Sequence, residues 1–371
     1  MDTIGIICEY NPFHNGHLYH IKKCKELYPD ATIILVVNGY FLERGEISLL
    51  NKEAKTKIAL DNGVDLVLSL PFFYGSQSAD NFALGAIKIL NLFKASKIIF
   101  GSESNNVPYL RSICESQASF ESELKEKLKK GMSYPKAINY LDENPISSPN
   151  DLLGLSYIKA IIKTKSIIEP ISIKRTNNYH DTKSNEKIIS AENIRNKLNK
   201  HLSIRSYVPK GASKNIEKLD INPLFPYLKY KVITEGVNIN KYLTVDEGIE
   251  NAIIKYIDEV NSIDELIKKV KCKRYTHNRL QRMIVHILIG LTKDDVKSYK
   301  KLDYVQILGF NNKGTSYLKH LENRKEIMQM TRNHHSIIYE YEIKCARIYD
   351  LLSKKNNLKF ERSNHPIFKE N

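Results

Sequence analysis

The sequence predicts an α/β fold in which a parallel sheet fills the N-terminal half and is followed by a mainly α-helical C-terminal half. Up to about residue 175 the chain repeats a short apolar run, a turn and a longer amphipathic segment, the pattern of parallel strands joined by helices. From about residue 193 helical spacing dominates. The 371 residues are enough for two domains, which we assign to residues 1–190 and 191–371.

Five short runs rich in Ile, Val and Leu are the expected strands, because strands covered on both faces are apolar throughout. They are residues 4–8, 32–37, 65–70, 97–101 and 171–174. Helices are expected at residues 18–27, 52–62 and 79–92, and Asn62 with Gly63 forms a helix stop signal. One further strand signal, at residues 303–308, lies in the helical half.

Composition restricts the class of protein and its partners. No apolar run approaches the roughly 18 residues that a membrane span needs, and the N-terminus lacks the features of a signal peptide, so we expect a cytoplasmic protein. Five scattered cysteines suggest neither disulfides nor a zinc cluster. The net charge of +15 favours nucleic acid as a partner, although a general bias toward lysine is an alternative explanation.

The most specific feature is the segment EYNPFHNGHL at residues 9–18, which connects the first strand to a helix. Ligands of open α/β sheets bind at the carboxyl ends of strands. Gly16 lets a ligand approach the backbone, and the helix start should offer unpaired N–H groups to phosphate. His14 and His17 can face the same side. We therefore predict phosphoryl or nucleotidyl chemistry with these two catalytic histidines; the alternative is that both are structural.

This segment resembles the HxGH signature of a nucleotidyltransferase superfamily whose members attack the α-phosphate of a nucleotide. Together with LERG (42–45), DLVLSLP (65–71), FGSE (100–103), PNDLLG (149–154) and KRYTH (273–277), it looks like the bacterial tRNA(Met) cytidine acetate ligase family. The resemblance implies a Rossmann-like HxGH nucleotidyltransferase domain. It also implies an ATP-dependent ligase that activates acetate as acetyl-adenylate and forms N4-acetylcytidine at the wobble position of elongator tRNA(Met).

The resemblance also implies the ATP site. It places ATP on Ile7, Cys8, Glu9, Tyr10, Asn11, Pro12, Phe13, His14, Asn15, Gly16, His17, Leu18, Tyr19, His20, Gly101, Asn150 and Arg175. The superfamily's second signature corresponds to ISAENIR at residues 189–195, where Glu192 replaces the usual threonine and Arg195 is a candidate for the β- and γ-phosphates. Mg²⁺ is expected with ATP, but neither Asp80 nor Glu103 is assigned as its ligand.

Acetate needs a cation beside an apolar wall, and Arg44 is the candidate, with a surface ion pair to Glu43 or Glu46 as the alternative. The base that takes the proton from the cytidine amine is not assigned. For tRNA we predict a basic strip with interleaved rings, made of Lys271, Lys273, Arg274, Tyr275, His277, Arg279 and Arg282. The alternative is an ordinary solvated helix face. The tyrosines at 227–230 are attributed to packing.

Two other functions remain possible on the sequence. An adenylyltransferase acting on a phosphorylated small metabolite would leave the basic C-terminal half without a role. A non-catalytic RNA-binding protein could keep a nucleotide pocket as a switch. The oligomeric state is not specified by the sequence.

Overall fold

The computed structural model describes residues 2–119, 148–175, 186–299, 301–363 and 365–370, with a few single residues between 120 and 147. Seven strands form one sheet in the order β5-β4-β1-β2-β3-β6-β7. They are β1 (Thr3–Cys8), β2 (Thr32–Asn38), β3 (Leu66–Leu70), β4 (Lys97–Ser102), β5 (Glu169–Lys174), β6 (Ile307–Asn311) and β7 (Ile367–Lys369). The five predicted N-terminal strands are thus confirmed to within two residues.

Strands β1 to β5 all pair in parallel, so their carboxyl ends meet at one edge of the sheet. Strand β6 pairs antiparallel with β3, placing Phe310 beside Leu66, and β7 extends the sheet beyond it. The predicted strand at 303–308 overlaps β6 at only two residues. The sheet therefore draws strands from both sides of residue 190. Local periodicity does not report such a pairing between distant parts of the chain.

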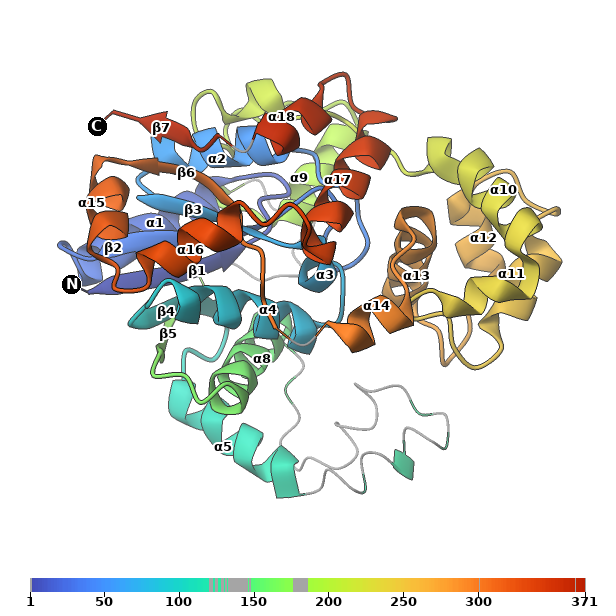
Figure 1. The fold of residues 1–371 in the computed structure, drawn as a ribbon, viewed down its shortest axis with the longest axis horizontal. Coiled ribbons are helices and arrows are strands. Elements are labelled where there is room, and N and C mark those ends of the chain that lie inside the picture. The colour runs from blue at the N-terminus through green and yellow to red at the C-terminus, as the bar shows by residue number, and fades with distance from the viewer. Residues whose placement is uncertain are drawn as a thin grey trace.

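Helices cover both faces of the sheet (Figure 1). Helices α1 (Asn15–Leu27) and α2 (Lys52–Asp61) pack on one face, and α4 (Ala79–Leu92) and α8 (Pro149–Lys163) pack on the other. Each face of the sheet has its own hydrophobic core, and alternate residues of β2 point into one or the other. Ile33 packs in the core under α1 and α2, and Ile34 packs in the core under α4 and α8. This two-sided burial explains why the strands are apolar throughout instead of alternating with polar residues.

The predicted helical half contains a separate group of helices beside the sheet (Figure 1). This group, which we call the helical lobe, consists of α10 (Phe225–Glu235), α11 (Ile249–Tyr256), α12 (Ile263–Val270) and α13 (His277–Ile289). The 3-10 helices at Asn222–Leu224 and Gly236–Lys241 pack against it, whereas the one at Ala212–Asn215 adds Ala212 to the core on the α1 and α2 face of the sheet. The other helices are α3 (Phe72–Gly75), α5 (Val107–Ser119), α9 (Ala191–Asn199), α14 (Lys293–Ser298), α15 (Asn312–His320), α16 (Arg324–Thr331), α17 (Ile337–Asp350) and α18 (Asn357–Ser363). None of the helices in the described residues is both long enough and apolar enough to cross a membrane.

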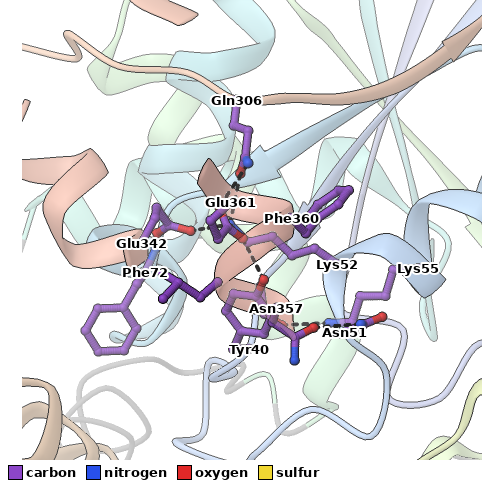
Figure 2. Close-up of polar contacts among 12 residues, drawn as sticks. Tyr40, Asn51, Lys52, Lys55, Phe72, Gln306, Glu342, Asn357, Phe360 and Glu361 are labelled. Carbon is purple, nitrogen blue, oxygen red and sulfur yellow. Dashed lines mark hydrogen bonds and ion pairs between the residues drawn. The ribbon is translucent and has the colours of Figure 1, made fainter. Parts of the chain in front are cut away.

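A buried ion network ties the C-terminal helices to the sheet (Figure 2). The Lys52 ammonium lies 2.5 Å from Glu342 of α17 and 2.9 Å from Glu361 of α18, and all three side chains are inaccessible to solvent or nearly so. Burial alone would lower the pKa of Lys52, but the two carboxylates raise it. Glu361 also accepts from Tyr40, just past β2, and Glu342 accepts from the amide of Phe72, just past β3. The C-terminal helices thus brace the edge of the sheet where strands end.

Candidate active site

His14 and His17 stand together where β1 passes into α1. His14 is the N-cap of α1, and its Nδ1 accepts from the amide of Gly16 at 3.0 Å. The amide of His14 in turn donates to Nδ1 of His17 at 3.2 Å, and the ring centroids are 3.9 Å apart. Because each Nδ1 accepts a hydrogen bond, the proton of each neutral ring belongs on Nε2. Two adjacent Nε2–H donors result.

The surroundings keep these histidines uncharged. Burial, with the charges of Arg175 and Arg195, lowers the pKa of His14 to about 3. Burial and the neighbouring His14 lower the pKa of His17 well below its ordinary value. Burial also lowers the pKa of His20 to about 4, and its Nε2 contacts the carbonyl of Ile99 at 3.0 Å. At neutral pH the site therefore offers hydrogen-bond donors to phosphate without the cost of burying an imidazolium.

The expectation that the start of α1 offers unpaired amides is wrong. The amide of Asn15 donates to the carbonyl of Tyr207, that of Gly16 to His14 Nδ1, and those of His17 and Leu18 to the carbonyl of His14. His14 thus takes the amides of Gly16, His17 and Leu18, and Tyr207 takes that of Asn15. The donors that remain for phosphate at this helix start are the imidazoles.

Two aromatic residues of the signature, Tyr10 and Phe13, pack against the His17 ring. Tyr10 and Phe13 are buried, with 1% and 0% of their surface exposed. The Tyr10 ring meets His17 edge-on at 4.8 Å between centroids and Phe13 at 4.7 Å. Tyr10 adopts a positive φ of 52°, which residues other than glycine rarely adopt and which clusters at functional sites. Within the predicted ATP segment, these two side chains shape the site instead of lining it.

The structure brings together the predicted ATP residues Gly101, Asn150 and Arg175 at the ends of β4 and β5. Arg175 donates to Asn150 Oδ1 at 3.2 Å, and Asn150 donates to Glu103 Oε1 at 2.5 Å. A Cβ atom at position 101 would lie 3.4 Å from Cγ of Arg175, an ordinary van der Waals contact, so Gly101 adjoins the Arg175 stem. The electrostatic influence of Arg175 on His14, His17 and His20 places this cluster beside the histidines.

Arg195 of the second signature lies beside the first one. Its Nη1 donates to the carbonyl oxygen of Asn11 at 2.9 Å, and its Nη2 lies 3.4 Å from Glu46 Oε1. Asn11 also donates to Glu46 Oε2 at 3.2 Å and accepts from the amide of Leu49 at 2.9 Å. The guanidinium therefore fixes the backbone three residues before His14. Glu192, one turn earlier on α9, lines a cavity of about 350 Å³ with Arg195.

Sequence reasoning named Glu9, Glu43 and Glu46 separately but did not predict that they gather at the ends of β1 and β2. Glu9 Oε1 accepts from Asn38 Nδ2 at 2.9 Å and from the amide of Glu43 at 2.7 Å, and burial raises the pKa of Glu9. Arg44 forms the predicted alternative, an ion pair with Glu43 at 3.9 Å. The LERG motif contains Glu43, which the sequence indicated only as an ion-pair partner of Arg44.

The residues of the predicted RNA strip do not all lie on one surface: five are at or near the surface of the helical lobe and two point inward. Lys271, Lys273 and His277 are exposed. Arg274 pairs with Glu247 at 3.3 Å, and Arg279 pairs with Asp246 at 4.0 Å. These five side chains lie at or near the surface of the helical lobe.

Two members of the strip point elsewhere. Tyr275 is 3% exposed, its hydroxyl donates to the carbonyl of Asp246, and Arg279 covers its ring, so its prediction as a base-stacking platform is corrected. The Tyr275 ring is buried in the apolar core beneath the strip and is not available to stack on RNA bases. Arg282 turns inward and donates to Glu43 Oε1 at 3.2 Å.

The carboxylates considered for metal have other partners. Asp80 accepts from Ser156 at 2.6 Å, and Glu103 belongs to the Asn150 and Arg175 cluster. Across the described residues, no three His, Cys, Asp or Glu side chains gather in a group that could hold a metal ion.

Comparison with known proteins identifies the family. Residues 1–364 match the family described as HIGH Nucleotidyl Transferase. The tRNA(Met) cytidine acetate ligases of Caldicellulosiruptor saccharolyticus and Fusobacterium nucleatum are 36% and 37% identical, and each alignment covers at least 99% of both chains. The chain belongs to the tRNA(Met) cytidine acetate ligase family. The resemblance found in the motifs is thereby confirmed.

Solved structures of this ligase family share the fold. Thermotoga maritima TmcAL without ligand superposes with a TM-score of 0.90 at 27% identity, covering all of both chains. A second form of the same protein, bound with alpha-thio ATP, superposes with a TM-score of 0.84 at 26% identity. The predicted fold class is confirmed.

Proposed function

We propose that this chain is an ATP-dependent ligase that activates acetate as acetyl-adenylate and transfers the acetyl group to N4 of the wobble cytidine of elongator tRNA(Met). The observation that carries the proposal is the pair of neutral imidazoles, His14 and His17, with adjacent Nε2–H donors at the carboxyl end of β1. Family membership supports the same activity, since the curated relatives carry this name.

In the first step, a carboxylate oxygen of acetate attacks the α-phosphorus of ATP and pyrophosphate leaves. His14 and His17 donate to the oxygens on which negative charge grows, a contribution worth about 10²–10³ in rate for one well-aimed donor. Gly101, Asn150 and Arg175 lie beside the histidines and would hold the rest of the nucleotide. Mg²⁺ would accompany ATP and neutralise its phosphates, with no protein ligand assigned. Arg44 remains the proposed cation for acetate.

In the second step, the acetyl group passes to tRNA and AMP leaves. The exposed cations of the helical lobe, Lys271 and Lys273 with His277, are the proposed contacts for RNA, and the overall charge of +15 favours a polyanion. We assign tRNA binding to the predicted region 191–371. The enzyme would act in the cytoplasm, where tRNA is modified.

The first step is tested without RNA. We expect radiolabelled pyrophosphate to exchange into ATP only when acetate is present. Exchange that ignores acetate but responds to a phosphorylated metabolite would support an adenylyltransferase instead. ATP binding with no exchange under any condition would support the non-catalytic alternative.

A further inference from the structure

Three glutamates gather at the carboxyl ends of β1 and β2, on the side of the signature that faces α13. They are Glu9, Glu43 and Glu46. Glu43 and Glu46 retain 21% and 29% of their side-chain exposure, so a substrate can reach them. A carboxylate cluster is an unusual feature beside a phosphate site, because it repels the nucleotide, and it needs a separate explanation.

The loop at residues 42–46 rests directly on α13 of the helical lobe. Arg282 of α13 donates to both the side chain and the carbonyl of Glu43, at 3.2 and 3.3 Å. Gly45 has a φ of +77°, and a side chain there would come within 2.5 Å of the Arg282 amide nitrogen. RNA bound along the exposed start of α13 would therefore lie in the same part of the molecule as this loop.

We propose that Glu43 accepts the proton that N4 of the target cytidine loses during acetyl transfer, and that Arg282 is the residue that positions its carboxylate. This assignment rests on the proposed function. The N4 lone pair forms a bond to the carbonyl carbon of acetyl-adenylate, and the bond from that carbon to the phosphate oxygen breaks. AMP leaves with the electron pair of that bond, and one N4 proton moves to a Glu43 carboxylate oxygen.

Hydrogen bonding excludes Glu46, and contact with α13 separates Glu43 from Glu9. Both oxygens of Glu46 are engaged, by Arg195 and Asn11. Glu9 Oε1 accepts from Asn38 and from the amide of Glu43, whereas the Glu43 side chain contacts Arg282 of α13, the helix that begins at the proposed RNA contact His277. Glu43 Oε1 accepts from Arg282, whereas the Arg44 Nε nearest to its Oε2 is 3.9 Å away, beyond hydrogen-bonding distance. Among the residues that the structure describes, Glu43 Oε2 thus accepts no hydrogen bond and is available for a new donor.

The charges around Glu43 suit a proton acceptor that works at neutral pH. Burial raises the pKa of Glu43 to about 7, Arg282 and Arg44 lower it, and Glu9 and Glu46 raise it. A base is most effective when its pKa lies close to the working pH. Because only the ionised form accepts a proton, acetyl transfer should accelerate as pH rises through about 7 and then level off.

The test isolates transfer from adenylation. Acetyl-adenylate is formed on the enzyme from ATP and labelled acetate, tRNA(Met) is added, and single-turnover transfer is followed from pH 6 to 8.5. Glu43→Gln should slow acetyl transfer by about 10²-fold or more and remove the rise of the transfer rate with pH near 7. The rate of adenylate formation should change far less. Glutamine keeps an oxygen for Arg282, and thermal denaturation verifies the fold. The matched control is Glu53→Gln, which alters an exposed ion pair on α2 and should change neither rate.

Arg282 supplies a second readout that a purely structural contact would not give. Removing its charge in Arg282→Gln removes an influence that lowers the pKa of Glu43, so the acidic limb of the transfer profile should move to higher pH. Arg282→Lys should restore most of the original limb. A structural role would instead reduce adenylation and transfer together with no movement of the limb.

Each result decides. Three results for Glu43→Gln would overturn the assignment of Glu43 but not the proposed function. They are transfer at the wild-type rate, a transfer rate that still rises with pH near 7, and equal losses of adenylation and transfer. A wild-type protein that forms no acetylcytidine would overturn the proposed function, and the assignment with it.

Discussion

Arg195 Nη1 donates to the carbonyl oxygen of Asn11 at 2.9 Å, so a residue of the second signature holds the backbone of the first. We expect Arg195→Gln to lower the rate constant of adenylate formation by roughly 10²-fold, because small displacements of catalytic groups carry losses of that order. ATP affinity should change little. Lys200→Gln, at the exposed end of α9, is the control of equal charge change. Weaker ATP binding at an unchanged rate constant would instead favour the phosphate contact that the sequence suggests.

His17 supplies one of the two Nε2–H donors. His17→Ala should reduce acetate-dependent pyrophosphate exchange by about 10²–10³. The loss of its contact with the His14 amide should lower stability only by about 1 kcal/mol. Exchange kinetics and thermal denaturation measure the two effects. Full exchange in a folded variant would exclude His17 from the chemistry.

Lys273 and Arg274 test the separation of RNA binding from adenylation. Changing both to Ala should weaken tRNA(Met) binding and flatten the dependence of log affinity on log salt, since fewer counterions are released. Acetate-dependent pyrophosphate exchange should persist. Affinity titrations at several salt concentrations give the slope, and a slope equal to that of the wild type would remove both residues from the RNA surface.

The buried network around Lys52 makes a prediction for stability. Lys52→Met leaves Glu342 and Glu361 buried without their cation, and removing one partner of a buried pair typically costs about 3–5 kcal/mol. Lys57→Met on the same helix breaks only an exposed pair with Glu53 and should cost less than about 1 kcal/mol. Urea denaturation compares the two. Equal, small losses would show that the network contributes little to folding.

The sequence predicted the parts of the fold that local pattern controls. Strands β1 to β5 emerged from short apolar runs, and the stop of α2 from Asn62 and Gly63. The return of β6 to the sheet did not emerge, because its partner Leu66 lies more than 200 residues earlier in the chain. For the same reason the ion network of Lys52 was invisible.

In the candidate site, too, the sequence predicted the features that depend on local spacing and not those that depend on contacts between distant residues. The three-residue spacing of His14 and His17 between a strand and a helix indicated the chemistry, because side chains three residues apart at a helix start lie on the same side. Spacing cannot tell which partner an arginine selects. Arg282 belongs to a basic run, yet its neighbour in space is Glu43, and Tyr275 belongs to the same run but lies in the core.

The most direct test of the central claim is mass spectrometry of nucleosides from unmodified elongator tRNA(Met) incubated with the protein, ATP, Mg²⁺ and acetate. We expect N4-acetylcytidine at the wobble position when all components are present and none when acetate or ATP is omitted. Unmodified cytidine in the complete reaction, with AMP attached instead to a small molecule, would contradict it.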